Sequence, residues 1–121
     1  MELLQVAQHA EDLGRATDFY RSLLGQEPVA EFDPPGLVFF RLGPIRLLID
    51  RAAPSSLLYL HVDDVRVTIE SLRASGATID TEPHVIFRHE DDTLGPSGNA
   101  EWHAFIRDSE GNLVGLVSHN P

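Results

Sequence analysis

Apolar residues recur at intervals of three and four in two stretches of the chain, the pattern of an amphipathic helix. The first stretch covers residues 13–24 and the second covers residues 65–72. Asp12 directly precedes the first stretch, where an N-cap is expected. Gly25 and Gly76 follow the two stretches, at positions typical of residues that end a helix. The pattern therefore predicts two helices, one in each half of the chain.

Short apolar runs separated by Gly, Pro, Asn or Asp occupy most of the remaining sequence, and such runs are typical of strands. A polar segment at residues 90–99 and the turn at residues 108–112 separate the last runs. Eight strands are predicted, at residues 3–10, 28–32, 37–42, 45–50, 57–62, 83–88, 102–107 and 113–118.

The order of these elements repeats within the chain. Adding 52 to a residue number takes His9 to His61, and adding 68 takes Gly43 to Gly111. Self-similarity at a fixed offset indicates a duplicated unit, here strand–helix–strand–strand–strand. One such unit cannot cover its apolar sheet face alone.

The duplication predicts an α+β fold with two βαβββ modules, residues 1–53 and 54–121, within a single domain of 121 residues. We expect a pseudo-two-fold axis to relate the modules. The eight strands would then form a partly open barrel around a cavity.

Charge and composition narrow the possible partners. Nine basic residues stand against 19 acidic ones, a net charge of −10, which disfavours nucleic acid and anionic membranes as partners. The chain has no Cys, so it offers neither a disulfide nor a thiol nucleophile. It also has no signal peptide pattern and no apolar run of roughly 20 residues. These observations predict a cytoplasmic protein.

Two motifs resemble those of the vicinal-oxygen-chelate superfamily. Residues 10–25 resemble its opening motif, V-x-D-L-x-x-x-x-x-F-Y-x-x-x-L-G, with Ala10 in place of the Val. Residues 105–114 resemble its closing F-x-x-D-P-D-G-N turn and last strand, with Ser109 in place of the Pro. The superfamily includes glyoxalase I, methylmalonyl-CoA epimerase, extradiol dioxygenases, and fosfomycin and bleomycin resistance proteins. The resemblance implies the two-module fold and a homodimer.

In metal-dependent members of this superfamily, His, Gln or Glu side chains from four strands hold a divalent ion that acts as a Lewis acid. The resemblance places these positions at Gln5, Leu47, Leu57 and Gly115. Only Gln5 has a donor atom, and one amide oxygen cannot hold a divalent ion against water. We therefore expect neither a metal nor another cofactor at this site.

Strand alternation predicts which side chains face the cavity. Gln5 and Ala7 share one face, and Leu57 and Tyr59 are their counterparts in the second module. Resemblance to the fosfomycin-resistance members adds His103 and Phe105. A largely apolar and aromatic lining with few polar groups is typical of a ligand pocket. The predicted ligand-binding residues are Gln5, Ala7, Leu47, Leu57, Tyr59, His103, Phe105 and Gly115.

His103 is the one candidate catalytic residue, because an imidazole that titrates near neutral pH can act as a general base. The alternative is a partly buried His that positions a neighbour. Glu101 lies two residues earlier on the same strand and is expected to meet solvent at the strand's start.

The other histidines have simpler interpretations. His9 and His61 are equivalent in the two modules, and we expect both to hydrogen-bond near strand ends. His84 and His89 flank an apolar run, and the segment from His89 to Asp92 is expected to be a solvated acidic loop, with a metal there left open.

Two arginines could meet an anionic group of a ligand. We expect Arg46 and Arg88 instead to pair with some of the many carboxylates.

These observations predict a protein that binds a small organic molecule, by analogy with the bleomycin-resistance group, and that has a degenerate metal site. The alternative is a metal-dependent lyase or isomerase, similar to glyoxalase I or methylmalonyl-CoA epimerase, with non-standard ligands such as His61 or His103. A third hypothesis is metal-free acid–base catalysis by His103.

Overall fold

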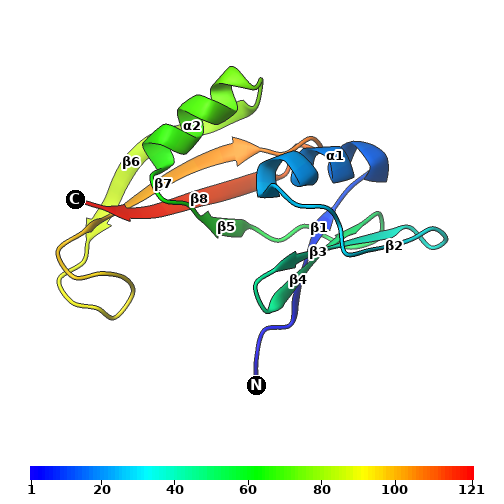
Figure 1. Ribbon diagram of the computed structural model, residues 1–121, viewed down its shortest axis with the longest axis horizontal. Helices are drawn as coiled ribbons and strands as arrows, with labels where there is room; N and C mark the ends of the chain where they lie inside the picture. The colour runs from blue at the N-terminus through cyan, green and yellow to red at the C-terminus, as the bar shows by residue number, and fades with distance from the viewer. The chain divides into compact units, whose positions relative to one another are not determined.

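The computed structural model describes all 121 residues, which form two compact units (Figure 1). Unit 1 consists of Met1–Ser56 together with the short segment Ser109–Asn112. Unit 2 consists of Leu57–Asp108 and Leu113–Pro121.

Unit 1 contains one helix and a four-stranded mixed sheet. The strands lie in the order β1-β4-β3-β2, with β1 parallel to β4 and the other pairs antiparallel. The elements are β1 (Gln5–His9), α1 (Leu13–Leu24), β2 (Ala30–Phe32), β3 (Leu37–Leu42) and β4 (Ile45–Asp50).

Unit 2 repeats this arrangement. Its strands lie in the order β5-β8-β7-β6, with β5 parallel to β8 and the other pairs antiparallel. The elements are β5 (Leu58–His61), α2 (Val65–Ala74), β6 (Thr78–Arg88), β7 (Ala100–Arg107) and β8 (Leu113–Asn120).

The same element order, strand order and strand directions in both units confirm the predicted α+β fold of two βαβββ modules. The eight strands form two separate sheets and do not close into one continuous barrel, in agreement with the partly open description. Neither α1 nor α2 has the length and apolar surface that a membrane-spanning helix needs.

The helices begin and end where the sequence predicts. Asp12 accepts a hydrogen bond from the Arg15 N–H at 2.9 Å and so satisfies one of the free donors at the start of α1. Gly25 has a φ of 67°, and its N–H donates to the Arg21 carbonyl to close the last turn. Asp64 caps α2 in the same way, through the Arg66 N–H.

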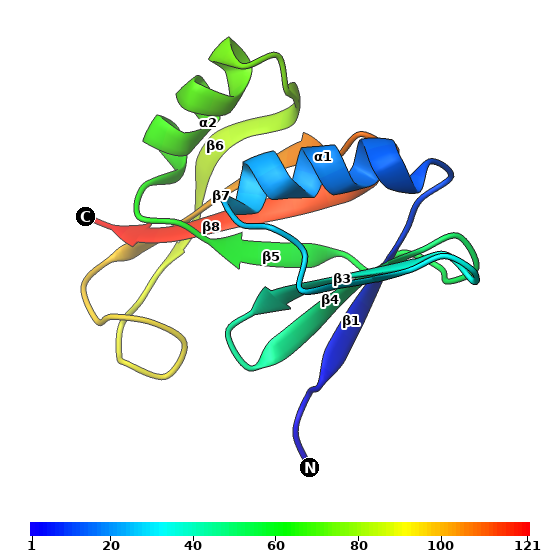
Figure 2. The same ribbon diagram turned by 45° about the vertical axis from the view of Figure 1, so that its right-hand side comes forward.

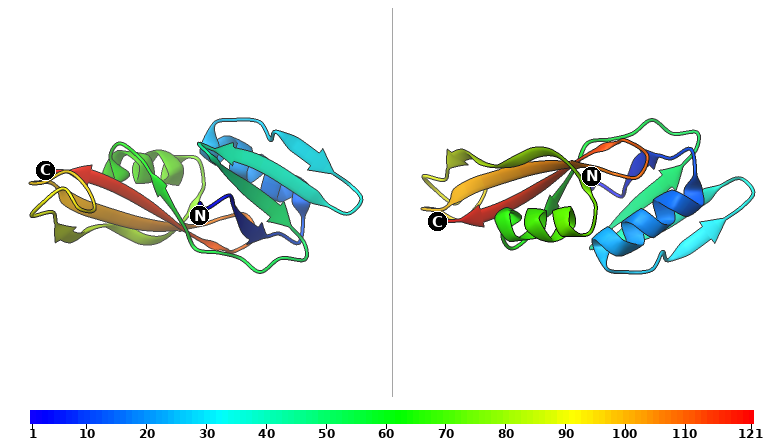
Figure 3. Two further views of the ribbon diagram at one scale, coloured as in Figure 1. Left: turned by 90° about the horizontal axis from the view of Figure 1, so that it is seen from below. Right: turned by 90° about the horizontal axis from the view of Figure 1, so that it is seen from above.

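One face of each sheet is covered by the helix of its own unit. Figure 2 shows α2 along one side of β6–β8, and Figure 3 shows α1 across β3 and β4. In unit 1 the Tyr20 ring of α1 packs against the Phe40 ring of β3, and both residues are buried. In unit 2 the buried Val65 and Ile69 lie on α2, and the buried Ile106 lies on β7.

Strand β6 is longer than the sequence analysis predicts. It begins at Thr78 instead of residue 83, because the polar run Thr78–Glu82 pairs with β7 as an edge strand. An edge strand has one free side, so it tolerates polar residues and the register shifts seen here. The polar composition of residues 78–82 is therefore the reason that the first half of this strand was not predicted.

Glu110 anchors the turn Ser109–Asn112 within unit 1. Its carboxylate accepts hydrogen bonds from the backbone N–H groups of Glu11 and Asp12 at 2.9 and 3.0 Å. Arg15 donates to the same carboxylate from Nε at 2.6 Å. The hydrogen bonds from Arg15, Asp12 and the Ser109 hydroxyl outweigh burial and lower the pKa of Glu110 to about 2.

This pKa makes an acid-dependent contribution to stability. Because the folded pKa lies below the ordinary value of 4.5, the contribution is complete above about pH 4.5 and is lost as the pH falls toward 2. We expect Glu110→Gln to lower the free energy of unfolding by about 2–3 kcal/mol at neutral pH. The difference from the unmodified protein should shrink as the pH falls through about 4, as measured by urea unfolding.

Glu31→Gln is the matched control, because Glu31 is an exposed carboxylate on β2 of the same unit. It should leave the acid profile unchanged. Equal pH profiles for Glu110→Gln and the unmodified protein would contradict the assignment.

Candidate functional site

The sheet of unit 2 has one face covered by α2 and one face that α2 leaves free. Strand alternation divides the residues between them. The buried Ala104, Ile106 and Leu116 lie on the covered face. The other face, here called the open face, carries Tyr59 and His61 from β5, Glu101, His103 and Phe105 from β7, and Gly115, Val117 and His119 from β8.

One end of the open face is aromatic. The Tyr59 ring lies 5.6 Å from the His103 ring and 5.9 Å from the Phe105 ring, measured between ring centroids. Tyr59 and Phe105 also flank Gly115 on the two neighbouring strands. Four of the residues predicted to bind a ligand therefore lie together within unit 2.

Gly115 is the reason that the rings can approach the sheet so closely. A Cβ atom at this position would lie 2.8 Å from Cδ1 of Tyr59 and 3.1 Å from Cε1 of Phe105. Real Cβ atoms essentially never have a contact under 3.0 Å, and a contact of 3.1 Å is tighter than most. The space above the β8 backbone is filled by the Tyr59 ring in place of a side chain from residue 115.

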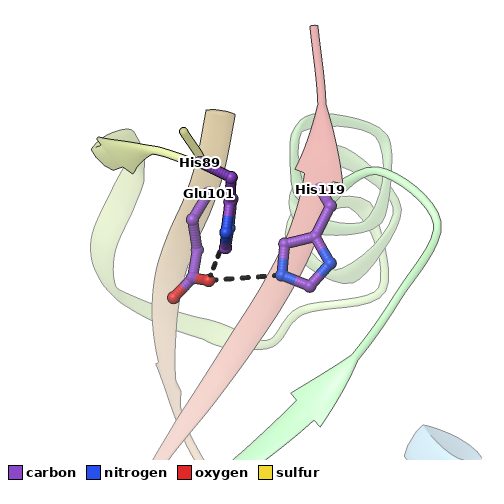
Figure 4. A group of neighbouring side chains, drawn as sticks. All are labelled: His89, Glu101 and His119. Atoms are coloured by element: carbon purple, nitrogen blue, oxygen red, sulfur yellow. Dashed lines mark hydrogen bonds and ion pairs between the residues drawn. The ribbon is translucent and has the colours of Figure 1, made fainter. Parts of the chain in front are cut away.

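The other end of the open face is polar and centres on the Glu101 carboxylate (Figure 4). Oε1 of Glu101 lies 3.1 Å from Nε2 of His89 and 3.2 Å from Nε2 of His119. Its second oxygen, Oε2, lies 2.7 Å from Nε2 of His103. We call Glu101, His89, His103 and His119 the Glu101 cluster.

The Glu101 cluster is largely shielded from water. The side chain of Glu101 is 15% exposed, and those of His89 and His119 are 2% and 18% exposed. Burial raises the pKa of the Glu101 carboxyl, but the hydrogen bonds from His103 and His119 outweigh it, so this pKa lies below the ordinary value for Glu. The carboxylate is therefore held as an anion in a partly buried place.

Two expectations about this region are wrong. Glu101 does not meet solvent at the start of β7, because His119 lies directly opposite it on β8 and His103 lies two residues along the same face. His89 is not part of a solvated loop. Its backbone is hydrogen-bonded to Asn99 and Gly98 across the base of the loop, and this turns its ring in toward Glu101.

Three of the four residues of the Glu101 cluster could have been placed together from the sequence. The turn at residues 108–112 pairs β7 with β8 symmetrically, so that Arg107 opposes Leu113 and Glu101 opposes His119. Counting back from the turn therefore places Glu101, His103 and His119 on one face. No comparable rule places His89, because its position depends on the path of the loop.

The open face of the unit 1 sheet carries the remaining polar candidates. Gln5 and Arg46 are paired on β1 and β4, and Arg46 stacks over the Phe39 ring at 5.6 Å. The side-chain oxygen of Gln5 and Nε of Arg46 are buried without a hydrogen-bond partner. Ala7 follows Gln5 on the same face, opposite Leu48.

Leu47 lies on the covered face of the unit 1 sheet. It is fully buried opposite Phe40, whose ring contacts the Tyr20 ring of α1. The register also corrects the repeat. Ala7 pairs with Leu48 as Tyr59 pairs with Gly115, so Leu48, and not Leu47, is the counterpart of Gly115.

The residues at the positions of the superfamily's metal ligands do not form a metal site. With Leu48 in place of Leu47, the four positions hold Gln5, Leu48, Leu57 and Gly115. Three of these offer no side-chain lone pair, and Leu57 is half-exposed. This donor set does not fit a divalent ion.

His9, His61 and His84 are separate from the Glu101 carboxylate. His9 bonds Glu11 at 3.1 Å near the end of β1, as expected. His61 is exposed, and its ring stacks beside that of His119 at 5.4 Å instead of bonding to a turn. His84 is exposed on β6 and bonds the Glu82 carbonyl.

The ion pairs expected for Arg46 and Arg88 are not formed. Arg88 donates to the Gly98 carbonyl, and Arg46 has no carboxylate within ion-pair distance. Arg46 is therefore a cation that a ligand's anionic group can still meet.

Unit 1 also has a cleft of about 290 Å³ on the side of its sheet where α1 lies. Asp18 and Arg21 of α1 and Phe32 of β2 are among its lining residues. Arg21 is already paired with Asp18 and Glu27. The cleft is open and contains none of the predicted site residues, so we do not assign it a function.

Comparison with known proteins agrees with the resemblance seen in the motifs. A family model described as the Glyoxalase/Bleomycin resistance protein/Dioxygenase superfamily matches residues 2–116. None of the curated proteins compared with the chain gives a significant match.

Several solved structures share the fold. TnmS3, an antibiotic binding protein from Streptomyces sp. CB03234, is 21% identical with a TM-score of 0.72, and the match covers 99% of this chain and 97% of that one. A lactoylglutathione lyase from Agrobacterium tumefaciens is 25% identical with a TM-score of 0.68, over 97% and 92% of the two chains. A glyoxalase I variant from Zea mays is 18% identical with a TM-score of 0.72. The match covers 99% of this chain but only 46% of the maize protein, so the chain spans about half of its length.

The close approach at Gly115 generates a prediction. Gly115→Ala should displace the half-exposed Tyr59 ring, because the ring can swing outward more easily than the β8 backbone can move. We expect a loss of about 1 kcal/mol or less in the free energy of unfolding. NMR should show shifted ring resonances for Tyr59 and Phe105. Gly14→Ala, whose Cβ would make only an ordinary contact, is the control. Unchanged ring resonances in Gly115→Ala would contradict the packing described here.

Proposed function

Because the chain belongs to the Glyoxalase/Bleomycin resistance protein/Dioxygenase superfamily, we propose that it binds a small organic molecule of aromatic or apolar character. The proposed contact surface is the aromatic end of the open face of unit 2. Tyr59, Phe105 and His103 supply the rings there, and Gly115, which has no side chain, lets the Tyr59 ring lie directly on the sheet.

The observation that carries this proposal is the replacement of a metal-ligand position by an aromatic surface. Residue 115 has no side chain, and the Tyr59 ring lies over its backbone. Tyr59 is 52% exposed, so much of its ring is available to stack on a ligand. Large, flat, partly exposed rings are the usual means of binding aromatic ligands. The fold neighbour TnmS3, which is described as an antibiotic binding protein, is consistent with this class of function.

Among the other predicted ligand-binding residues, Gln5 lies on the open face of unit 1, beside Arg46. Each of these two residues has a buried polar atom without a partner, so this face by itself offers hydrogen bonds to a polar ligand. Ala7 and Leu57 remain predicted contacts. Leu47 is better assigned to the core of unit 1.

A binding experiment tests the proposal. Metal-free bleomycin and a panel of fused-ring aromatic compounds would be titrated into protein kept in a chelator, with calorimetry and NMR as readouts. We expect saturable binding that Tyr59→Ala weakens about 10-fold, through the loss of ring contacts. Phe32→Ala is the matched control, because Phe32 is 51% exposed but lies in unit 1.

Two results would contradict this function. One is the absence of saturable binding across the whole panel. The other is binding that neither Tyr59→Ala nor Phe105→Ala alters. In either case the aromatic end of the open face is not the binding surface.

The hydrogen bond between His103 and Glu101 favours a second candidate function, metal-free acid–base catalysis. With Nε2 donating to Oε2 of Glu101 at 2.7 Å, the imidazole keeps a lone pair on Nδ1 and so has the form of a general base. A carboxylate partner also stabilises the protonated imidazole that forms during proton abstraction. This mechanism fits a lyase or isomerase that removes a proton beside a carbonyl group.

This candidate has its own test. Glutathione and methylglyoxal, which form a hemithioacetal in solution, would be supplied as substrate in the presence of a chelator. If His103 is the base, His103→Gln abolishes thioester formation while the substrate Kd stays within a few-fold. No turnover by the unmodified protein would reject the base for this substrate.

The alternative of a metal-dependent lyase or isomerase is separated from both by metal analysis. It requires a stoichiometric metal that is lost in Gln5→Ala.

The expectations of a homodimer, a cytoplasmic location and a lack of nucleic-acid partners rest on the superfamily and on the net charge of −10.

A further inference from the structure

The Glu101 cluster presents the donor atoms of a transition-metal site at a place where the superfamily's metal is not expected. His89, Glu101 and His119 each offer one ligand atom, and these atoms all lie within 4.8 Å of one another. Two imidazole nitrogens and one carboxylate oxygen are a ligand set that suits zinc and related divalent ions. Figure 4 shows one oxygen of the Glu101 carboxylate joined by dashed lines to both imidazole rings, and this oxygen is Oε1.

We propose that His89, Glu101 and His119 bind a divalent transition-metal ion, with zinc as the best match. This proposal goes beyond the small-molecule binding described above. His119 lies four residues beyond Gly115 on β8, and neither His89 nor Glu101 lies on β5 or β8. The site is therefore different from the four superfamily positions at Gln5, Leu48, Leu57 and Gly115.

The distances between the ligand atoms are already close to those around a bound zinc ion. Ligands at 2.0–2.2 Å from a tetrahedral zinc ion lie about 3.3 Å from one another. Oε1 of Glu101 lies 3.1 Å from the His89 nitrogen and 3.2 Å from the His119 nitrogen. All three ligand atoms lie within 4.8 Å of one another, close enough to meet at one ion. Three protein ligands leave a fourth position for water or a bound molecule.

The surroundings hold the ligands in place. The Nε2 atom of His103 is hydrogen-bonded to Oε2 of Glu101, which leaves Oε1 for the ion. Metal ligands are commonly held by such hydrogen bonds from neighbouring residues. The His89 backbone donates to the Asn99 carbonyl and accepts from the Gly98 N–H. These contacts fix the ring of a residue that lies on a loop.

The loop between β6 and β7 has a glycine against the two ligand nitrogens. Gly95 lies so close that a Cβ atom there would be 3.0 Å from Nε2 of His89 and 3.1 Å from Nε2 of His119. Any other residue at position 95 would crowd the two nitrogens that the ion needs. The same loop carries Glu90, Asp91 and Asp92, which raise the local concentration of cations.

Without an ion, the same atoms form a closed hydrogen-bond network in which three histidines donate to one carboxylate. To bind the ion, each of the two rings would carry its proton on Nδ1 and present the Nε2 lone pair, beside Oε1 of Glu101. The two states therefore differ in the bound metal and in the tautomer of the two rings.

The experiment uses the full chain without a histidine tag, first stripped with a chelator and then dialysed against zinc. Elemental analysis and calorimetry measure stoichiometry and Kd, and cobalt substitution reports coordination through its visible absorption. We expect one equivalent of metal. His89→Ala, Glu101→Gln and His119→Ala should each weaken binding at least about 10-fold, and Gly95→Ala should weaken it by crowding.

His84→Ala and Gln5→Ala are the matched controls, since His84 is an exposed histidine of unit 2 and Gln5 is the one donor at the superfamily position. Both should keep the full affinity. Circular dichroism checks that every variant is folded, and Glu101→Gln and Gly95→Ala remain informative if a histidine variant is not.

Three outcomes would overturn the site. These are no stoichiometric metal in the unmodified protein, metal that all the ligand variants retain, and metal that Gln5→Ala removes. Only the third also counts against the proposed binding function, because it would place the ion at the superfamily position. Failure of the ligand titrations in chelator would count against that function alone.

Discussion

A four-stranded sheet has two faces, and each unit of this chain has only one helix to cover them. Strand alternation places apolar side chains on the face beneath the helix, where Phe40 and Leu47 lie in unit 1 and Ile106 and Leu116 lie in unit 2. The second face of each sheet is left with residues that do not form a core, among them Gln5, Arg46, Tyr59, Glu101, His103 and His119. Both proposed functions belong to these second faces.

A partly buried carboxylate organises one end of the unit 2 face. An ionised Glu is costly to remove from water unless hydrogen bonds or opposite charge compensate it. Glu101 obtains three histidine partners from β7, β8 and the loop that follows β6. Glu110 obtains its own compensation from Arg15 and two backbone N–H groups in unit 1. Glu110 is satisfied by cationic and amide donors, whereas the partners of Glu101 are imidazoles, a side chain that is also a common metal ligand.

The two ends of the open face of unit 2 suit different ligands. The Tyr59 and Phe105 rings pack edge to face over Gly115, at a position where the superfamily places a metal ligand. The Glu101 cluster places metal-type donors farther along β8, and His103 contacts both ends through its bond to Glu101 and its ring contact with Tyr59. An organic molecule on the aromatic surface would therefore lie beside the polar cluster.

Local sequence patterns were enough to predict the two modules, most of the strands and both helices. The capping residues Asp12 and Gly25 were predictable in the same way, because periodicity and turn residues act over a few positions. The lack of donor atoms at three of the four superfamily positions was also predictable, because it follows from the residue types alone. The first half of β6 was missed because edge pairing overrode its polar composition. The repeat offset placed Leu47 on the wrong face, since a one-residue slip reverses the face of a strand.

The metal-type cluster was decided by tertiary structure. Glu101 and His119 meet only through the register of β7 with β8, and His89 reaches them only because the loop is closed by its bonds to Gly98 and Asn99. Sequence determines which donor atoms the chain has and how they alternate along a strand. Whether donors 12 and 18 residues apart share one point in space depends on long-range pairing and loop paths, which no local pattern specifies.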